Sequence, residues 1–181
     1  MKHLNRITTF TFSLLMLLAI NVTAQEFKGL DKSPMDAAAF PANYKVADKL
    51  IKIVYSRPQL NDRKLSDLAP NGKVWRTGEN EAAELTLYTD MKLGDTKVKA
   101  GIYTFYVIPG DKEWTAIISK DLNVWGSYFY NEANDVARLS VPVSTGKESL
   151  EAFSIAFEEA DNGVHMHLGW GTTRVAVPFT K

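Results

Sequence analysis

Residues 102–108 read IYTFYVI, with Gly101 before them and the pair Pro109 and Gly110 after them. β-branched and aromatic residues of this kind favour a pleated strand. Both faces of the segment are apolar or aromatic, which is typical of a strand that is covered on both sides. Gly101 interrupts the pattern before the segment, and Pro109 with Gly110 indicates a tight turn after it. The segment therefore predicts a central strand of a sheet.

Segments on both sides of this strand alternate between apolar and polar residues, as half-buried strands do. They are residues 49–55, 84–90, 97–100, 113–119, 135–141, 151–157, 164–170 and 173–179. Pro142 predicts the end of the strand before it, because proline cannot donate a ladder hydrogen bond. With about eight strands and no helix longer than a turn or two, the pattern predicts an all-β fold. We expect a single antiparallel β-sandwich or jelly-roll-like barrel over residues 49–181.

The first 24 residues have the pattern of a cleavable secretory signal. A basic start precedes the apolar run at 7–20, and small residues stand before Gln25. The run is shorter than the roughly 20 residues that cross a bilayer, so we expect cleavage after Ala24 rather than an anchor. This predicts a periplasmic or secreted protein with no membrane insertion after cleavage. Residues 25–48 are expected to form an N-terminal arm packed on the domain, with one short helical turn at 37–39.

Composition excludes several classes of function. The chain has no cysteine, which excludes disulfides, thiolate metal sites and cysteine nucleophiles. After cleavage, 19 basic and 21 acidic residues would remain, a net charge near −2. Such a surface gives no electrostatic reason to expect nucleic acid as a partner. Walker, G-x-G-x-x-G, G-x-S-x-G, H-E-x-x-H and EF-hand patterns are all absent.

Two segments are rich in functional residue types but lack strand or helix periodicity. Residues 70–84 read PNGKVWRTGENEAAE, and residues 120–135 read KDLNVWGSYFYNEAND. Ordered irregular loops carry function more often than the scaffold that holds them. We therefore expect a binding site to be formed by these two loops, here called the first loop and the aromatic loop.

Several short motifs occur in a characteristic order. They are YSRP at 55–58, NGKVWRTGENEA at 71–82, KAGIYTFYVIPG at 99–110 followed by Trp114, and WG at 125–126 with Asp135 and Arg138 downstream. Together they resemble a family of exported bacterial proteins, domain of unknown function 2911. The resemblance covers nearly all of the chain after the signal and implies export and a single mostly-β domain. It implies no activity. Glu79 and Ala83 depart from the usual W-R-T-G-A-N-E-A-T pattern, so we place no nucleophile there.

The first loop supports two interpretations. Glu79 and Glu81 lie two residues apart near Arg76, so the two carboxylates could act as general acid and base in glycoside hydrolysis. Alternatively, Arg76 pairs with a glutamate to hold the loop, while Trp75 fills the core. The sequence leaves both interpretations open.

Arginines and aromatic residues offer further candidates. Arg57 could join Arg76 in an anion pocket, or cap a sheet edge. Asp135 and Arg138 are expected to form an ion pair at the start of a strand. Rings from both loops could form a sugar-stacking platform, although aromatic residues of β proteins more often lie in the core. These rings belong to Trp75, Trp125, Tyr128 and Tyr130.

His165 and His167 lie one residue apart on a predicted strand, so they point to the same face, as in H-x-H metal sites. The only other histidine is His3, within the predicted signal. We therefore predict no metal and no cofactor.

We expect a non-catalytic binding module for a small molecule, glycan or protein partner. The alternatives are a hydrolase of a glycan or envelope polymer that uses Glu79 or Glu81, and a structural envelope protein without a ligand. The candidate ligand-binding residues are Arg57, Trp75, Arg76, Asn80, Glu81, Trp125 and Arg138.

Overall fold

The computed structural model describes residues 25–181, and the predicted signal peptide at 1–24 lies outside the described residues. The chain divides into a short N-terminal unit that ends at Leu30 and a second unit, Asp31–Lys181, that contains every described strand. No helix among residues 25–181 has the length and apolar character that a membrane crossing requires. The β fold is therefore a property of the second unit.

Nine strands form one antiparallel sheet in the order β1-β2-β3-β6-β7-β8-β9-β4-β5. The strands are β1 (Met35–Phe40), β2 (Ile51–Ser56), β3 (Ala83–Leu87), β4 (Met91–Leu93), β5 (Thr96–Val98), β6 (Gly101–Ile108), β7 (Glu113–Ser119), β8 (Asp135–Ala160) and β9 (Gly163–Thr180). The described helices are α2 (Leu65–Leu68) and the 3-10 turn η1 (Glu132–Asn134). The predicted mostly-β, antiparallel fold is confirmed, and β6 lies inside the sheet as expected.

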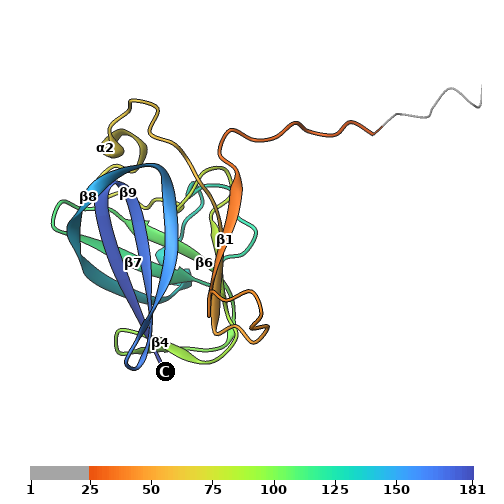
Figure 1. The fold of residues 1–181 in the computed structure, drawn as a ribbon, viewed down its shortest axis with the longest axis vertical. Helices are drawn as coiled ribbons and strands as arrows, with labels where there is room; N and C mark the ends of the chain where they lie inside the picture. The colour runs from red at the N-terminus through yellow and green to blue at the C-terminus, as the bar shows by residue number, and fades with distance from the viewer. Residues whose placement is uncertain (1–24) are drawn as a thin grey trace, which may run out of the picture. The chain divides into compact units, whose positions relative to one another are not determined.

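The sheet bends strongly along β8 and β9 (Figure 1). Sequence patterns predicted two strands in each of these segments, and that division is wrong. Pro142 is the last residue of β8 that pairs with β7, and from Val143 onward β8 pairs with β9. Because proline lacks an N–H donor, it suits the point where a strand leaves one partner. One continuous strand therefore serves both halves of the sheet.

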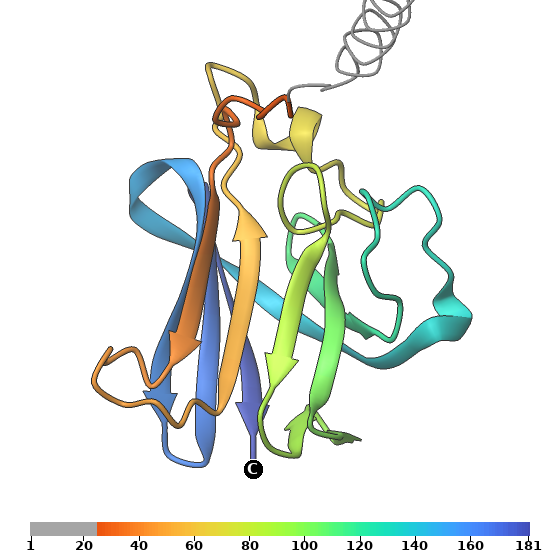
Figure 2. The ribbon, with the colours of Figure 1, turned by 90° about the vertical axis from the view of Figure 1, so that its right-hand side faces the viewer.

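The two halves face each other across the core. Figure 2 shows β1, β2, β3 and β6 side by side in one layer, with the long β8 and β9 ribbons behind it. Alternating residues of the strands point inward, as the period of two requires. The inward residues of β9 are Val164, Met166, Leu168, Trp170, Val175, Val177 and Phe179, all buried. This arrangement is compatible with the predicted sandwich.

Aromatic side chains from distant segments meet at the centre of the core. The indole of Trp75 stacks on Trp170, with centroids 5.5 Å apart and planes at 19°. Phe153 approaches the same indole edge-on at 4.9 Å, and Trp114 does so at 6.3 Å. Trp75 also pairs through its backbone with Val107 of β6. The first loop is thus anchored in the core by its tryptophan.

The segment before β2 differs from expectation. The predicted helical turn at 37–39 is wrong, because these alanines belong to β1, which pairs with β2 from Met35↔Ser56 to Phe40↔Ile51. Helix propensity is a weak preference that tertiary context overrides. Here the open edge of β2 supplies a hydrogen-bond ladder that an isolated helical turn would lack. The hairpin of β4 with β5 was predicted only in part, since β4 was not expected.

After β2 the chain makes contacts with β8 that join the two layers. Gln59 forms an isolated bridge with Ala152, and the N–H of Phe153 donates to the carbonyl of Pro58 at 2.9 Å. The buried Tyr55 hydroxyl accepts a hydrogen bond from the N–H of Ile155 at 2.8 Å. These contacts join segments that are far apart in the sheet order.

We expect Tyr55→Phe to lower the free energy of unfolding by about 1–3 kcal/mol, because it leaves the buried Ile155 N–H without an acceptor. The matched control is Tyr103→Phe, whose hydroxyl bonds the carbonyl of Lys99 at 2.9 Å in an exposed position. The control should change stability by less than about 1 kcal/mol, because water can replace that bond. Urea unfolding measures both changes, and equal effects would contradict the role given to Tyr55.

Candidate functional site

The two irregular loops predicted from the sequence lie against each other. The N–H of Ala82 donates to the carbonyl of Val124 at 3.1 Å, and the N–H of Gly126 donates to that of Asn80 at 2.9 Å. The hydroxyl of Ser127 donates to the carbonyl of Val74 at 2.8 Å. These bonds fix the aromatic loop to the first loop.

Left-handed backbone conformations allow both loops to turn sharply. Asn80 has φ 61°, Asn123 has φ 56° and Gly126 has φ 66°. Asparagine and glycine tolerate this region better than other residues. The asparagine and glycine residues that indicate loops in the sequence thus form the turns that bring the two loops together.

A pocket of about 180 Å³ opens where the loops meet the outer face of the sheet, and we call it the loop-junction pocket. Its lining residues are Met35, Val54, Glu81, Ala82, Glu84, Thr104, Leu122, Asn123 and Val124. Val54, Glu84 and Thr104 are neighbours in register across β2, β3 and β6. Each alternates with an inward-pointing residue, so all three point to the outer face.

The charge of this pocket is negative. Glu81 and Glu84 are exposed, and neither makes an ion pair within 4.0 Å among residues 25–181. No lysine or arginine lines the pocket, and Met35, Val54, Leu122 and Val124 give it an apolar wall. The pocket thus combines two free carboxylates with hydrocarbon surface.

Arg57 lies away from this pocket, at the junction of β1, β2 and β8. Its guanidinium donates to the carbonyl of Phe153 at 3.1 Å and to the hydroxyl of Ser154 at 2.8 Å, and it pairs with Asp36 at 3.1 Å. These bonds hold the residue after β2 against β1 and β8.

Arg76 is half-buried and follows Trp75 on an extended segment, so it points away from the core. Its Nε is buried without a hydrogen-bond partner among residues 25–181, and Arg76 makes no salt bridge with Glu79 or Glu81 there. The hydroxyl of Ser33 instead donates to the carboxylate of Glu79, which does not line the pocket. The pocket therefore brings together Glu81 and Glu84, not Glu79 and Glu81.

Arg138 belongs to a polar cluster at the start of β8. It donates to Asp135 and to the hydroxyl of Tyr130, and it pairs with Glu132 at 3.2 Å. The Tyr130 hydroxyl donates to Asp135 at 2.6 Å. The predicted ion pair of Asp135 and Arg138 is confirmed. The cluster holds the end of the aromatic loop on β8.

The four aromatic residues considered for a stacking platform do not share one surface. Trp75 is 5% exposed and lies in the core, whereas Trp125 is 56% exposed and Tyr128 is 75% exposed. Tyr130 packs edge-on against Tyr106, with centroids 5.3 Å apart. Of these four, only Trp125 and Tyr128 are largely exposed, and Trp125 bridges the pocket residue Glu81 through the backbone.

His165 and His167 share a face of β9, with ring centroids 6.1 Å apart. Nε2 of His167 lies 2.9 Å from Glu158. Within residues 25–181, no three His, Cys, Asp or Glu side chains are grouped so that they could hold a metal ion.

Sequence reasoning located both loops, which supply most of the lining residues, but among these residues it named only Glu81 as a candidate for ligand binding. Met35, Val54, Glu84 and Thr104 come from β1, β2, β3 and β6. Period-two alternation could have placed Val54 and Glu84 on an outer face. The lateral order of these strands has no local signal, so their meeting could not be read from the sequence.

Comparison with known proteins identifies a family. A family model described as "Protein of unknown function (DUF2911)" matches residues 34–179. The chain therefore belongs to this family, as its motifs indicated. No curated protein and no solved structure matches it.

Two tyrosines of the aromatic-loop region predict a pH dependence of stability. Burial and the hydrogen bond to Asp135 raise the pKa of Tyr130 from 10.0 to about 12. Burial, followed by the charges of Asp121 and Asp135, raises the pKa of Tyr106 to about 12. A raised pKa keeps the folded state protonated where the unfolded state ionises. The contribution of these two tyrosines to the free energy of unfolding is therefore complete below pH 10, and it is lost as the pH rises toward about 12.

We expect the free energy of unfolding to fall with pH across this interval, with a smaller slope in Tyr106→Phe and Tyr130→Phe and the smallest slope in the double variant. Urea unfolding at a series of pH values measures the slope. An unchanged slope in the double variant would show that other groups cause the loss of stability at alkaline pH.

Proposed function

We propose that this protein is a non-catalytic binding module that takes a small ligand in the loop-junction pocket. The observation that carries the proposal is the combination, in one pocket, of two carboxylates without a cationic partner among the described residues and an apolar wall. An organic cation with a hydrocarbon part, such as an alkylammonium group, complements both features.

The fixed geometry of the pocket supports this proposal. Three hydrogen bonds hold the loops together before any ligand arrives, which reduces the ordering cost of binding. Its volume of about 180 Å³ is smaller than the roughly 300–1,000 Å³ of pockets for drug-sized ligands. The occupant is therefore a small amine, or the cationic end of a larger partner.

An anionic ligand fits less well. Arg57 and Arg138 are each held by several acceptors of the protein, and neither they nor Arg76 line the pocket. A carboxylate or phosphate would meet Glu81 and Glu84 without a compensating cation. These two carboxylates therefore disfavour the anion pocket considered from the sequence.

We expect alkylammonium compounds to raise the thermal midpoint in a panel that also contains neutral sugars and organic anions. Glu84→Gln should weaken binding about 1.5- to 5-fold, since exposed ion pairs contribute about 0.2–1 kcal/mol. Added salt should weaken it further through screening. The matched control is Glu159→Gln, which changes an exposed residue of β8 outside the pocket and should leave affinity unchanged.

Other outcomes of the same screen would replace this proposal. Stabilisation by sugars alone that is lost in Trp125→Ala would favour a glycan-binding module that uses Trp125. Turnover of a glycan that is lost in Glu81→Gln would favour the hydrolase alternative. No response to any compound would favour a structural envelope protein.

We also propose that the protein is exported, on the strength of the signal-like pattern at residues 1–24. The protein recovered from the envelope or medium of an expressing bacterium should begin at Gln25. Intact-mass measurement and N-terminal sequencing test this expectation. A chain that keeps Met1 and stays in the cytoplasm would contradict it.

A further inference from the structure

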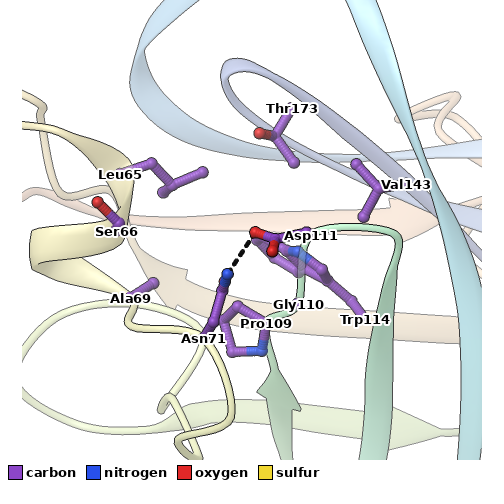
Figure 3. Close-up of a pocket in the computed structure, with 10 residues that line it drawn as sticks. All are labelled: Leu65, Ser66, Ala69, Asn71, Pro109, Gly110, Asp111, Trp114, Val143 and Thr173. Carbon is purple, nitrogen blue, oxygen red and sulfur yellow. Dashed lines mark hydrogen bonds between the residues drawn. The ribbon is translucent and has the colours of Figure 1, made fainter.

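A second pocket, of about 240 Å³, lies at the turn between β6 and β7, and we call it the Trp114 pocket (Figure 3). Its lining residues are Leu65, Ser66, Ala69, Asn71, Pro109, Gly110, Asp111, Trp114, Val143 and Thr173. They come from α2 and the segment after it, the β6–β7 turn, β7, β8 and β9. None of them lines the loop-junction pocket.

The indole of Trp114 is the first sign that this pocket takes a ligand. Trp114 is only 4% exposed, and its N–H donates to no residue among 25–181. Its Nε1 is not one of the buried side-chain atoms that lack a partner in this part of the chain, so this donor is open to solvent. By contrast, the N–H of Trp170 donates to the carbonyl of Glu151 at 3.0 Å. Indole N–H groups of buried tryptophans normally have an acceptor. Trp114 lines the pocket (Figure 3), so a ligand there can replace water as the acceptor of this N–H.

A carboxylate lines the same pocket. Nδ2 of Asn71 donates to Oδ1 of Asp111 at 2.5 Å, which orients the carboxylate and leaves Oδ2 available (Figure 3). The hydroxyls of Ser66 and Thr173 also line the pocket, and neither makes a hydrogen bond to the described part of the chain. The pocket thus offers an acceptor, an indole donor and two hydroxyls.

Apolar side chains complete the wall, from Leu65, Ala69, Pro109 and Val143. Figure 3 shows Leu65 and Val143 on opposite sides of the space above Asp111. No lysine, arginine or histidine is among the lining residues. A carboxylate or phosphate would therefore meet Asp111 without a counter-charge, while a simple cation could not accept a hydrogen bond from the indole N–H.

We propose that the Trp114 pocket binds an uncharged polyhydroxylated ligand of the size of one sugar ring or cyclic polyol. A hydroxyl can accept from the indole N–H and another can donate to Asp111, because each hydroxyl both donates and accepts. The C–H groups of the ring lie against the apolar wall. The proposal is independent of the ligand in the loop-junction pocket.

The test is a titration of the ¹⁵N-labelled protein with myo-inositol and a panel of neutral hexoses, observed through the indole N–H resonances. The Trp114 signal is assigned by its loss in Trp114→Phe. We expect a saturable shift of this signal, while the signals of Trp75 and Trp170 stay in place and report an intact core. Asp111→Ala should weaken binding about tenfold or more, since it removes a hydrogen bond to a charged group.

Asp161→Ala, in the turn between β8 and β9, is the matched control and should bind as the unchanged protein does. Glu84→Gln changes the loop-junction pocket and should leave this titration unchanged. This control shows that the titrated site is not the loop-junction pocket. The proposal is overturned if no panel member shifts the Trp114 signal saturably, if only alkylammonium or acetate does so, or if Asp111→Ala retains full affinity.

Discussion

The burial of one indole determines how the irregular part of this chain is arranged. Trp75 belongs to a loop without strand or helix periodicity, yet its ring stacks on Trp170 of β9 and contacts Phe153 of β8. A large aromatic side chain removed from water contributes more than most single contacts of a small domain. Thr77 is buried as well, and the chain then emerges at Asn80 and Glu81. There they meet the aromatic loop, and the two together shape a pocket.

The second constraint is the continuity of β8. Because Pro142 lets the strand leave β7 and join β9 without a loop, the two layers share one piece of backbone. The Trp114 pocket lies close to this change of partner, with Val143 in its wall. Both pockets therefore depend on segments that the backbone holds in place: one on the loop pair, the other on the bend of the sheet.

Local patterns predicted the strands and their faces well, because period-two alternation is a property of each segment alone. Ile53, Leu85 and Trp170 point inward as their neighbours indicated. The ion pair of Asp135 and Arg138 was also within reach, since its partners lie three residues apart. Properties that depend on distant partners were not predictable. The alanines of β1 form a strand only because β2 provides hydrogen-bond partners for their backbone. Each pocket is lined by residues from several segments that are distant in sequence.

The bonds between residues 58–60 and 151–153 have a consequence for how the chain acquires its structure. They join positions separated by most of the domain, so their loop-closure entropy must be overcome before they stabilise anything. Folding rate decreases as contacts become more distant along the chain. We therefore expect hairpins such as β6 with β7 and β8 with β9 to form before these distant contacts do. Because residues 151–153 belong to the C-terminal third, these bonds between the layers require that part of the chain to be present.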